Sequence, residues 1–267
     1  LKKIIILFIL GISIKLILAD SLNTINELLI NKKTFLNIFE IGFLSYSYSL
    51  QIYFDFFGYS LCAIALGKTF GINLPSNFLN PYSSKTPREF WQRWHVTLSR
   101  WLRDYVYIPM GGNKKYTRNI IFVFMICGIW HGSNFNFLLW GIYHGFLIIL
   151  HKQTKLLWES LPETIQLLFN FSLISFGWIF FIFDSNQLTQ IFFNVRYEYM
   201  DLMGIFGLKI LFIYILFLLA VKIRLKKLYL FFYRKKNGII SPIILGVVML
   251  MNIILMLDTN EFIYFRF

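Results

Sequence analysis

Two neighbouring stretches decide the fold of this chain: residues 86–114 read TPREFWQRWHVTLSRWLRDYVYIPMGGNK, and residues 127–145 read CGIWHGSNFNFLLWGIYHG. Together they hold three of the four histidines (His95, His131 and His144) and five of the seven tryptophans. Long apolar runs dominate the sequence on either side. Titratable and aromatic residues set between such runs predict a chemical site held inside a membrane.

The composition is typical of a membrane protein. Hydrophobic residues make up 57% of the 267 residues and charged residues 15%, whereas soluble domains carry about 25% charged residues. Apolar runs of about 17 residues or more recur, and this length crosses a hydrocarbon layer. The runs lack the two-residue alternation of barrel strands. We therefore expect an all-α, polytopic transmembrane protein.

Basic loops orient the predicted spans. Ordinary spans are expected at residues 4–19, 38–66, 165–183, 204–221 and 239–257. Seven Lys and Arg fill the loop 222–236, and nine lie within 67–118. The positive-inside rule places both loops in the cytoplasm if residues 119–150 turn back as a hairpin. The net charge of +13 then reflects topology, since nucleic-acid binding would need a soluble basic face.

No repeat or soluble linker divides the sequence, so residues 1–267 are interpreted as one membrane domain. The chain opens on Leu1 instead of a start methionine, and we expect it to lack an N-terminal part. Cys62 and Cys127 lie in apolar runs as buried small hydrophobes.

An amphipathic helix is predicted over residues 86–105. Thr86 suits the N-cap, Pro87 the first helical position and Glu89 the third, which together make a capping box. Tryptophans and His95 recur at helical spacing on one face, and arginines lie largely off it. This pattern is typical of a helix that lies in the membrane interface.

Residues 119–150 are apolar but too long for one simple span, and they predict a broken, re-entrant hairpin. Gly128, Gly132 and the polar pair Ser133 and Asn134 are expected to interrupt the run near its centre. The arms are expected at 119–131 and 134–150. Irregular backbone at membrane depth is tolerated only where protein or a cavity surrounds it.

The histidines are the candidates for chemistry. His131, at the break of the hairpin, could accept a proton from a hydroxyl, or could bond a neighbouring helix. His95 is either part of the same site or an anchor like its tryptophan neighbours. His144 shares its helix with Gly141 and Gly145, a spacing that allows close helix packing, so packing is the favoured role.

Two further sets of residues are candidates to line a site. Gln51, Asp55 and Tyr59 share one helix face, either as a buried hydrogen-bond cluster or as part of a site wall. Trp94 and Trp130 flank the histidines. The sequence has no metal-ligand spacing, no phosphate-binding loop and no nucleophile elbow. Acyl transfer from a thioester fits, because it needs only a base and positioning.

In these motifs the chain resembles the membrane-bound O-acyltransferase (MBOAT) family, in its alginate and peptidoglycan O-acetyltransferase branch. The likeness rests on LQIYFDFFGYS (50–60), FGINLPSNFLNPY (70–82), FWQRWHVTLSRWLRDYVYIPMGGNK (90–114), GIWHGSNFNFLLWGIYHG (128–145) and FIYFRF (262–267). The resemblance implies that His131 is the family's principal histidine and that His95 is the second. It also implies that Asp55, Trp94, Trp130 and His144 line a tunnel.

The resemblance further implies partners and a location. An acyl group, with acetyl-CoA as donor and no bound cofactor, would pass through the bacterial inner membrane to an exported polysaccharide. A periplasmic transferase of the SGNH type would assist. One departure is Leu61, where the family usually carries Asp. A D-alanyl transferase that uses a carrier protein, a transporter and a non-catalytic membrane protein remain as alternatives.

Overall fold

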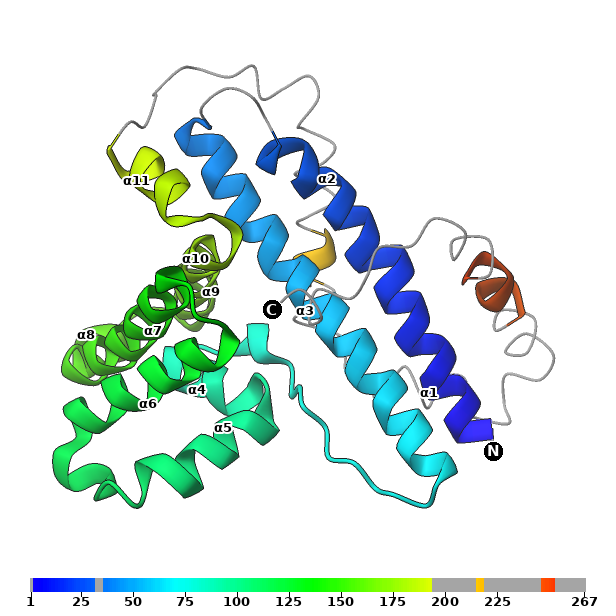
Figure 1. Cartoon of the computed structure of the whole chain (residues 1–267), viewed down its shortest axis with the longest axis horizontal. Coiled ribbons are helices and arrows are strands. Elements are labelled where there is room, and N and C mark those ends of the chain that lie inside the picture. Colours follow the sequence, from blue (N-terminus) through cyan, green and yellow to red (C-terminus); the bar gives the residue numbers. More distant parts are fainter. Residues whose placement is uncertain (1, 32–35, 194–214, 219–245, 253–267) are drawn as a thin grey trace.

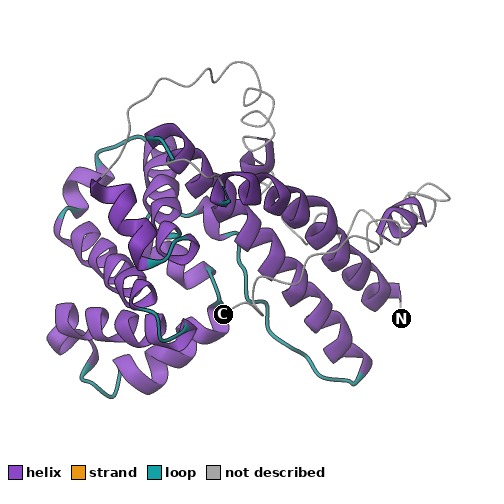
Figure 2. Cartoon of the chain, turned by 45° about the horizontal axis from the view of Figure 1, so that its top comes forward, coloured by secondary structure: helices purple, strands orange, loops and turns teal. Residues whose placement is uncertain are grey.

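The structure, a computed structural model, describes residues 2–31, 36–193, 215–218 and 246–252 (Figure 1). Within these ranges every regular element is a helix, which confirms the all-α prediction (Figure 2). Three helices are long and apolar enough to cross a membrane: Lys2–Ile30, Ile38–Thr69 and Glu163–Ile182. They contain the predicted spans 4–19, 38–66 and almost all of 165–183. Of the predicted spans 204–221 and 239–257, only residues 215–218 and 246–252 are described, and the basic loop 222–236 lies outside the described residues.

The first long helix runs further than the sequence suggested. Helix α1 (Lys2–Ser13), a π-helical turn (Ile14–Ala19) and α2 (Asp20–Ile30) are continuous, whereas the first span was expected to end at Asp20. The Lys15 ammonium forms a salt bridge with the Asp20 carboxylate, and the lysine side chain is almost fully buried. Because the two charges are paired within the same helix, the chain need not leave it there.

Helix α3 (Ile38–Thr69) packs along the whole of this first helix (Figure 1). The two backbones approach most closely at Gly11 and Gly58. A Cβ added to Gly11 would lie 2.8 Å from the carbonyl oxygen of Gly58, and one added to Gly58 would lie 2.6 Å from that of Gly11. The crossing therefore requires the smallest side chain on both helices.

The connection after α3 is anchored to the bundle before the next helix starts. The hydroxyl of Tyr82 donates to the carbonyl oxygen of Ser49 at 2.6 Å. The indole of Trp158 donates to the carbonyl oxygen of Lys85 at 2.8 Å. These bonds fix the entry to α4 (Pro87–Arg93).

The predicted capping box at α4 forms only in half. The Thr86 hydroxyl accepts from the backbone N–H of Glu89 at 3.1 Å, as expected. The Glu89 carboxylate instead accepts from the N–H of Lys85 at 2.7 Å, one residue before the cap. Both interactions still satisfy backbone groups that the first turn would leave open.

The single helix predicted over residues 86–105 is wrong, because it is interrupted at Trp94 and His95. Helix α5 (Val96–Leu102) and a π-helical turn (Arg103–Tyr107) follow the interruption. Trp94 is extended and His95 is left-handed, with a φ of 41°. Helical spacing alone does not report such a break.

The hairpin is formed by α6 (Tyr116–His131) and α7 (Phe135–Gln153), which lie side by side (Figure 1). The predicted break is confirmed at residues 132–134. It does not include Gly128, which lies inside α6, where a Cβ would lie 2.2 Å from the carbonyl oxygen of Phe137 on α7. The depth of the hairpin in the membrane stays a prediction. The remaining helices are α8 (Lys155–Glu159), α9 (Glu163–Gly177), α10 (Ile179–Ile182) and α11 (Ser185–Phe193). Helix α9 contacts α3, and α10 packs on α7.

Candidate functional site

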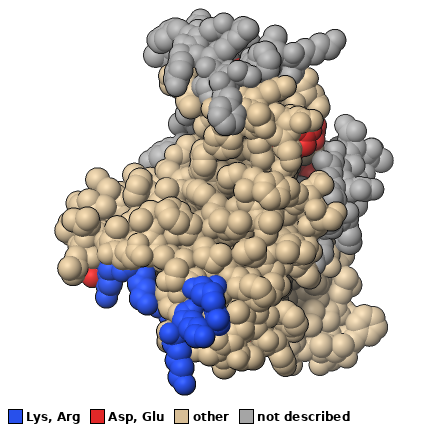
Figure 3. Space-filling model, turned by 60° about the vertical axis from the view of Figure 1, so that its left-hand side comes forward, with Lys and Arg blue, Asp and Glu red and all other residues tan. Residues whose placement is uncertain are grey.

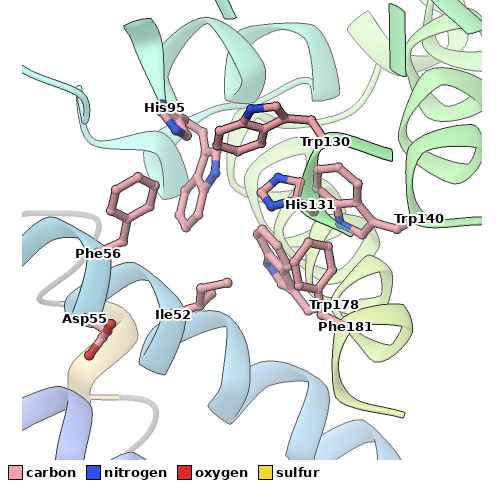
Figure 4. A pocket seen from close by; sticks show the side chains of 10 residues that line it. Ile52, Asp55, Phe56, His95, Trp130, His131, Trp140, Trp178 and Phe181 are labelled. Atoms are coloured by element: carbon pink, nitrogen blue, oxygen red, sulfur yellow. The ribbon is translucent and has the colours of Figure 1, made fainter. Parts of the chain in front are cut away.

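His95 and His131 line one cavity of about 130 Å³ (Figure 4). Its walls come from α3, from the break between α4 and α5, from the hairpin and from α10. Of the predicted site residues, Asp55, Trp94 and Trp130 also belong to the wall, and His144 does not. The structure thus brings together five of the six predicted residues from three separate parts of the chain. We call this the central cavity.

His131 reaches the cavity because α6 ends there. The next residue, Gly132, has a φ of 157° and a ψ of 168°, a conformation that is almost restricted to glycine. A Cβ on Gly132 would lie 2.6 Å from the ring of Phe137, so the turn has no room for a side chain. The imidazole of His131 meets the rings of Trp140 and Phe181 edge to face, with centroids 5.2 and 5.1 Å apart.

His95 reaches the cavity through a different kind of break. Its left-handed backbone is uncommon for a residue other than glycine and is disfavoured by sterics. The loop before α4 compensates: the N–H of Val96 donates to the carbonyl oxygen of Asn77, and the N–H of Leu79 donates to that of Arg93, both at 3.0 Å. Tertiary hydrogen bonds therefore hold the strained residue in place.

The ring of His95 lies among aromatic side chains, with one of its nitrogens near a hydroxyl. It meets the ring of Phe56 edge to face, with centroids 4.9 Å apart, and lies near that of Trp130. Its Nδ1 is 3.5 Å from the hydroxyl of Thr97, at the limit of a hydrogen bond. Its Nε2 is buried and has no hydrogen-bond partner among the described residues. A buried polar atom of this kind calls for an explanation, such as a ligand.

Asp55 lines the central cavity, but its carboxylate lies near the first long helix, which packs on the other side of α3. Figure 4 shows the carboxylate pointing away from both histidines. It lies 3.8 Å from the Lys15 ammonium of the first helix. Gln51, one turn earlier, bonds the side chains of Asn23 and Asn26 at 2.7 and 2.5 Å. Of the two roles left open for Gln51, a buried hydrogen-bond cluster or part of a site wall, the structure therefore supports the hydrogen-bond cluster.

His144 lies behind the site, in line with a packing role. It is fully buried, and Trp140 separates it from His131: the centroids of His144 and Trp140 are 5.0 Å apart. Neither ring nitrogen has a hydrogen-bond partner among the described residues. A Cβ on Gly177 would lie 2.5 Å from Nε2, so this glycine makes the space that the imidazole fills.

Five wall residues were missed in the sequence: Ile52, Phe56, Trp140, Trp178 and Phe181. Ile52 and Phe56 lie on α3 close to Asp55, which was predicted. Trp140 lies within the motif region, one hairpin arm away from His131, and the hairpin prediction could have placed it opposite that residue. Trp178 and Phe181 come from the end of α9 and from α10. They are ordinary aromatic residues of an apolar run, and no local signal distinguishes them.

Two larger cavities adjoin the central cavity. One, of about 410 Å³, is lined by Arg88, Arg100 and Arg103 together with His95 and His131; we call it the arginine cavity. Figure 3 shows Lys and Arg gathered along one edge of a face that is otherwise largely uncharged.

The other, of about 480 Å³, is lined by the hairpin turn, including Ser133 and Asn134, and by the segment from Phe180 to Asp184; we call it the polar cavity. His131 lines all three cavities. A group that enters from either larger cavity would therefore meet the same imidazole.

A metal centre has no support in the part of the chain that the structure describes. No group of three or more His, Cys, Asp or Glu is placed there to hold an ion. The two cysteines are free. The neighbours of His131 are aromatic rings, which stabilise a neutral imidazole by packing but do not ligate a cation.

Part of the chain is similar in sequence to curated acyltransferases. The chain is 39% identical over 183 residues to the peptidoglycan O-acetyltransferase of Helicobacter pylori, a match that covers 66% of this chain and 35% of that protein. It is 43% identical over 142 residues to the probable alginate O-acetylase AlgI of Azotobacter vinelandii, covering 51% and 28%. It is 34% identical over 159 residues to the teichoic acid D-alanyltransferase of Bacillus subtilis, covering 52% and 40%.

The chain thus matches about a third of the length of the first two relatives. Residues 30–183, which hold every residue of the central cavity, match the sequence profile of the membrane-bound O-acyltransferase family. With its helical architecture and its three candidate membrane helices, this chain belongs to the membrane-bound O-acyltransferase family.

Proposed function

We propose that this chain carries the catalytic centre of a membrane O-acyltransferase, with His131 as the base and proton relay. The observation that carries the proposal is that His131 lines two large cavities of different character, one with three arginines and one with polar groups of the hairpin turn, as well as the small central cavity. A donor in the arginine cavity and an acceptor in the polar cavity would meet at this imidazole. Proximity of this kind supplies much of what acyl transfer requires.

The arginine cavity suits the donor. Arg88, Arg100 and Arg103 have exposed side chains, and Arg103 also pairs with Asp104 at 2.7 Å. Guanidinium groups bind phosphate oxygens in paired hydrogen bonds. Acetyl-CoA carries phosphates at the end remote from its thioester, so its nucleotide part would bind the arginines while the thin pantetheine arm reaches inward. The predicted cytoplasmic position of the 67–118 loop agrees with a cytoplasmic donor.

The chemical steps need no metal or covalent enzyme intermediate. The imidazole of His131 accepts the proton of the acceptor hydroxyl as its oxygen attacks the thioester carbonyl. The tetrahedral intermediate then collapses, the C–S bond breaks, and the imidazolium returns the proton to the departing thiolate. His95 lines the same cavity and its Nε2 has no partner among the described residues, so in this proposal it would donate to the carbonyl oxygen as negative charge develops there.

The acceptor is proposed to be a hydroxyl of an exported cell-surface polysaccharide. The relatives named for peptidoglycan and alginate acetylation support this class. The protein would work in the bacterial cytoplasmic membrane, surrounded by lipid. A periplasmic transferase of the SGNH type is the partner expected on the outer side, with the polysaccharide as the final acceptor of the acyl group.

Replacement of His131 tests the proposal. Membranes that carry the native protein are given an acetyl thioester and glycan acceptors, and ester-linked acetate is measured. His131→Gln should lower the rate by about a hundredfold or more, because general-base catalysis contributes about 10² to 10⁴. His151→Gln is the matched control, since His151 lies outside the central cavity at the end of α7. Equal rates for His131→Gln and wild type, at equal protein levels, would refute the proposal.

Transfer of D-alanine is a second candidate, favoured by the 34% identity to the teichoic acid D-alanyltransferase. The same histidines would act, but the thioester would be carried by a protein. Supplying acetyl-CoA and a D-alanyl carrier protein in parallel separates the two: only one donor should be consumed with dependence on His131.

A further inference from the structure

The central cavity has a side that adjoins the arginine cavity and a side that faces away from it. Trp94, His95 and His131 line both cavities, so they mark the side on which the two adjoin. Figure 4 shows Trp178 and Phe181 on the other side of His131 from His95. A thioester that enters from the arginine cavity would therefore point its acyl group at Trp178 and Phe181.

This second side, which we call the far wall, is made of Ile52, Trp140, Trp178 and Phe181. The three aromatic rings pack on one another. The centroid of Phe181 lies 4.9 Å from that of Trp140 and 5.3 Å from that of Trp178, and the two tryptophans are 5.9 Å apart. All four side chains are buried. Close-packed side chains of this kind do not move aside without a cost in stability.

The volume of the central cavity limits what can lie beside His131. It is about 130 Å³, and an apolar cavity of about 150 Å³ holds one benzene molecule, which has about six non-hydrogen atoms. The reacting centre of an acetyl transfer has about five: the methyl carbon, the carbonyl carbon and oxygen, the sulfur and the attacking oxygen. One further carbon fills the space, and a second one exceeds it.

The polar cavity is a poorer place for the end of a longer acyl chain. It shares His131 and Phe181 with the central cavity, so a chain could reach it past these two rings. Its lining also includes Ser133, Asn134 and Asp184. An alkyl chain would take water from their polar groups without offering hydrogen bonds in return. The acyl group is therefore expected to stay against the far wall.

We propose that the far wall limits the acyl group to about two or three carbon atoms, and that Trp178 and Ile52 are residues that set this limit. The inference rests on the proposed function and adds the length of the acyl group, whether coenzyme A or a carrier protein brings it. Trp140 and Phe181 pack directly on the imidazole of His131, so their replacement would disturb the proposed base. Trp178 and Ile52 are the better residues to change.

The test uses membranes that carry the native protein, with glycan acceptors present. Acetyl, propionyl, butyryl and hexanoyl groups are offered on coenzyme A and, separately, on a phosphopantetheine carrier protein. The His131-dependent release of thiol is measured, which counts transfer to any acceptor. Trp178→Phe and Ile52→Ala each remove about three carbon atoms from the far wall. Ile41→Ala is the matched control, since it makes the second deletion on the same helix but in a separate hydrophobic cluster.

Wild type should lose about tenfold or more in kcat/KM for each carbon beyond three, as expected for methylenes that a closed pocket cannot hold. The butyryl-to-acetyl ratio of kcat/KM should rise about tenfold in Trp178→Phe and Ile52→Ala. In Ile41→Ala it should stay within about twofold of wild type. Damage to the fold lowers both rates together, so the ratio reports the shape of the cavity.

Two results would overturn the inference and leave the acyltransferase proposal intact. One is equal use of acetyl and hexanoyl groups by wild type with dependence on His131. The other is an unchanged butyryl-to-acetyl ratio in both Trp178→Phe and Ile52→Ala. Absence of His131-dependent thiol release for every acyl group on both carriers would overturn the inference and the proposed function together.

Discussion

The α1–α3 pair and the α6–α7 hairpin are built alike and used differently. In both, helices meet through glycine: Gly11 faces Gly58 in the first, and in the second a Cβ on Gly141 would lie 2.1 Å from the carbonyl oxygen of Phe124. The first pair buries polar groups that bond one another, as Gln51 does with its two asparagines. The hairpin instead ends at His131, whose ring opens on cavities.

The difference separates a scaffold from a site. Hydrogen bonds between the first helices stabilise one arrangement of them, whereas a buried polar atom that lines a cavity without a protein partner can bind a ligand. His95 has such an atom, since it lines the central cavity and its Nε2 is buried without a partner among the described residues. We therefore expect changes in the α1–α3 pair to alter stability, and changes around the hairpin to alter turnover.

The largest effect is expected for Gly141→Ala. The added methyl group would overlap the backbone carbonyl of Phe124, so the hairpin arms must separate. Overpacking of this kind costs about 3 kcal/mol or less in most cores, and the shift would also displace His131. We expect a lower unfolding temperature in detergent and lower turnover per folded molecule. Gly42→Ala is the control, because nothing lies within 4 Å of its added Cβ; equal behaviour of both variants would contradict the close packing.

His95→Asn should lower activity and spare the fold. Asparagine tolerates the left-handed backbone better than most residues, so the break between α4 and α5 should persist. Loss of the imidazole should reduce kcat by about ten- to a hundredfold, with KM for the thioester little changed. His95→Gly should show the same loss. Full activity in either variant would show that the ring serves only as a membrane anchor.

Gln51→Leu should lower stability and spare activity, the reverse of His95→Asn, and its effect should be smaller. It leaves the side chains of Asn23 and Asn26 without their bonds to the glutamine. The free energy of unfolding should fall by about 1 kcal/mol, the typical value of such bonds in membrane proteins. Turnover per folded molecule should stay within about twofold of wild type. A large loss of turnover would mean that the two helix pairs are functionally coupled.

Much of the contrast between the α1–α3 pair and the α6–α7 hairpin could be predicted from the sequence. The apolar runs predicted the three described membrane helices, and Gly132 with its polar neighbours predicted the break that exposes His131. The motifs that carry the family resemblance contain both histidines of the central cavity. These features are local, and local sequence signals them directly.

The remainder depends on contacts between distant segments. The break at His95 is held by backbone bonds to the loop at Asn77, which no periodicity reports. The first long helix continues past Asp20 as α2 because Lys15 pairs with Asp20 inside the helix. Trp178 and Phe181 enter the cavity wall only after α9 and α10 have packed on the hairpin. In each case tertiary structure overrides the local pattern.

In the proposed function, His131 lies between a donor mouth on the cytoplasmic side and an acceptor mouth on the opposite side of the membrane. Labelling with a membrane-impermeant maleimide tests it most directly, after Cys62→Ala and Cys127→Ala remove the native thiols. Arg103→Cys reports on the arginine cavity and Ser133→Cys on the polar cavity. The account predicts that the first is labelled only from the cytoplasmic side and the second only from the outside. Labelling of both from the same side would contradict it.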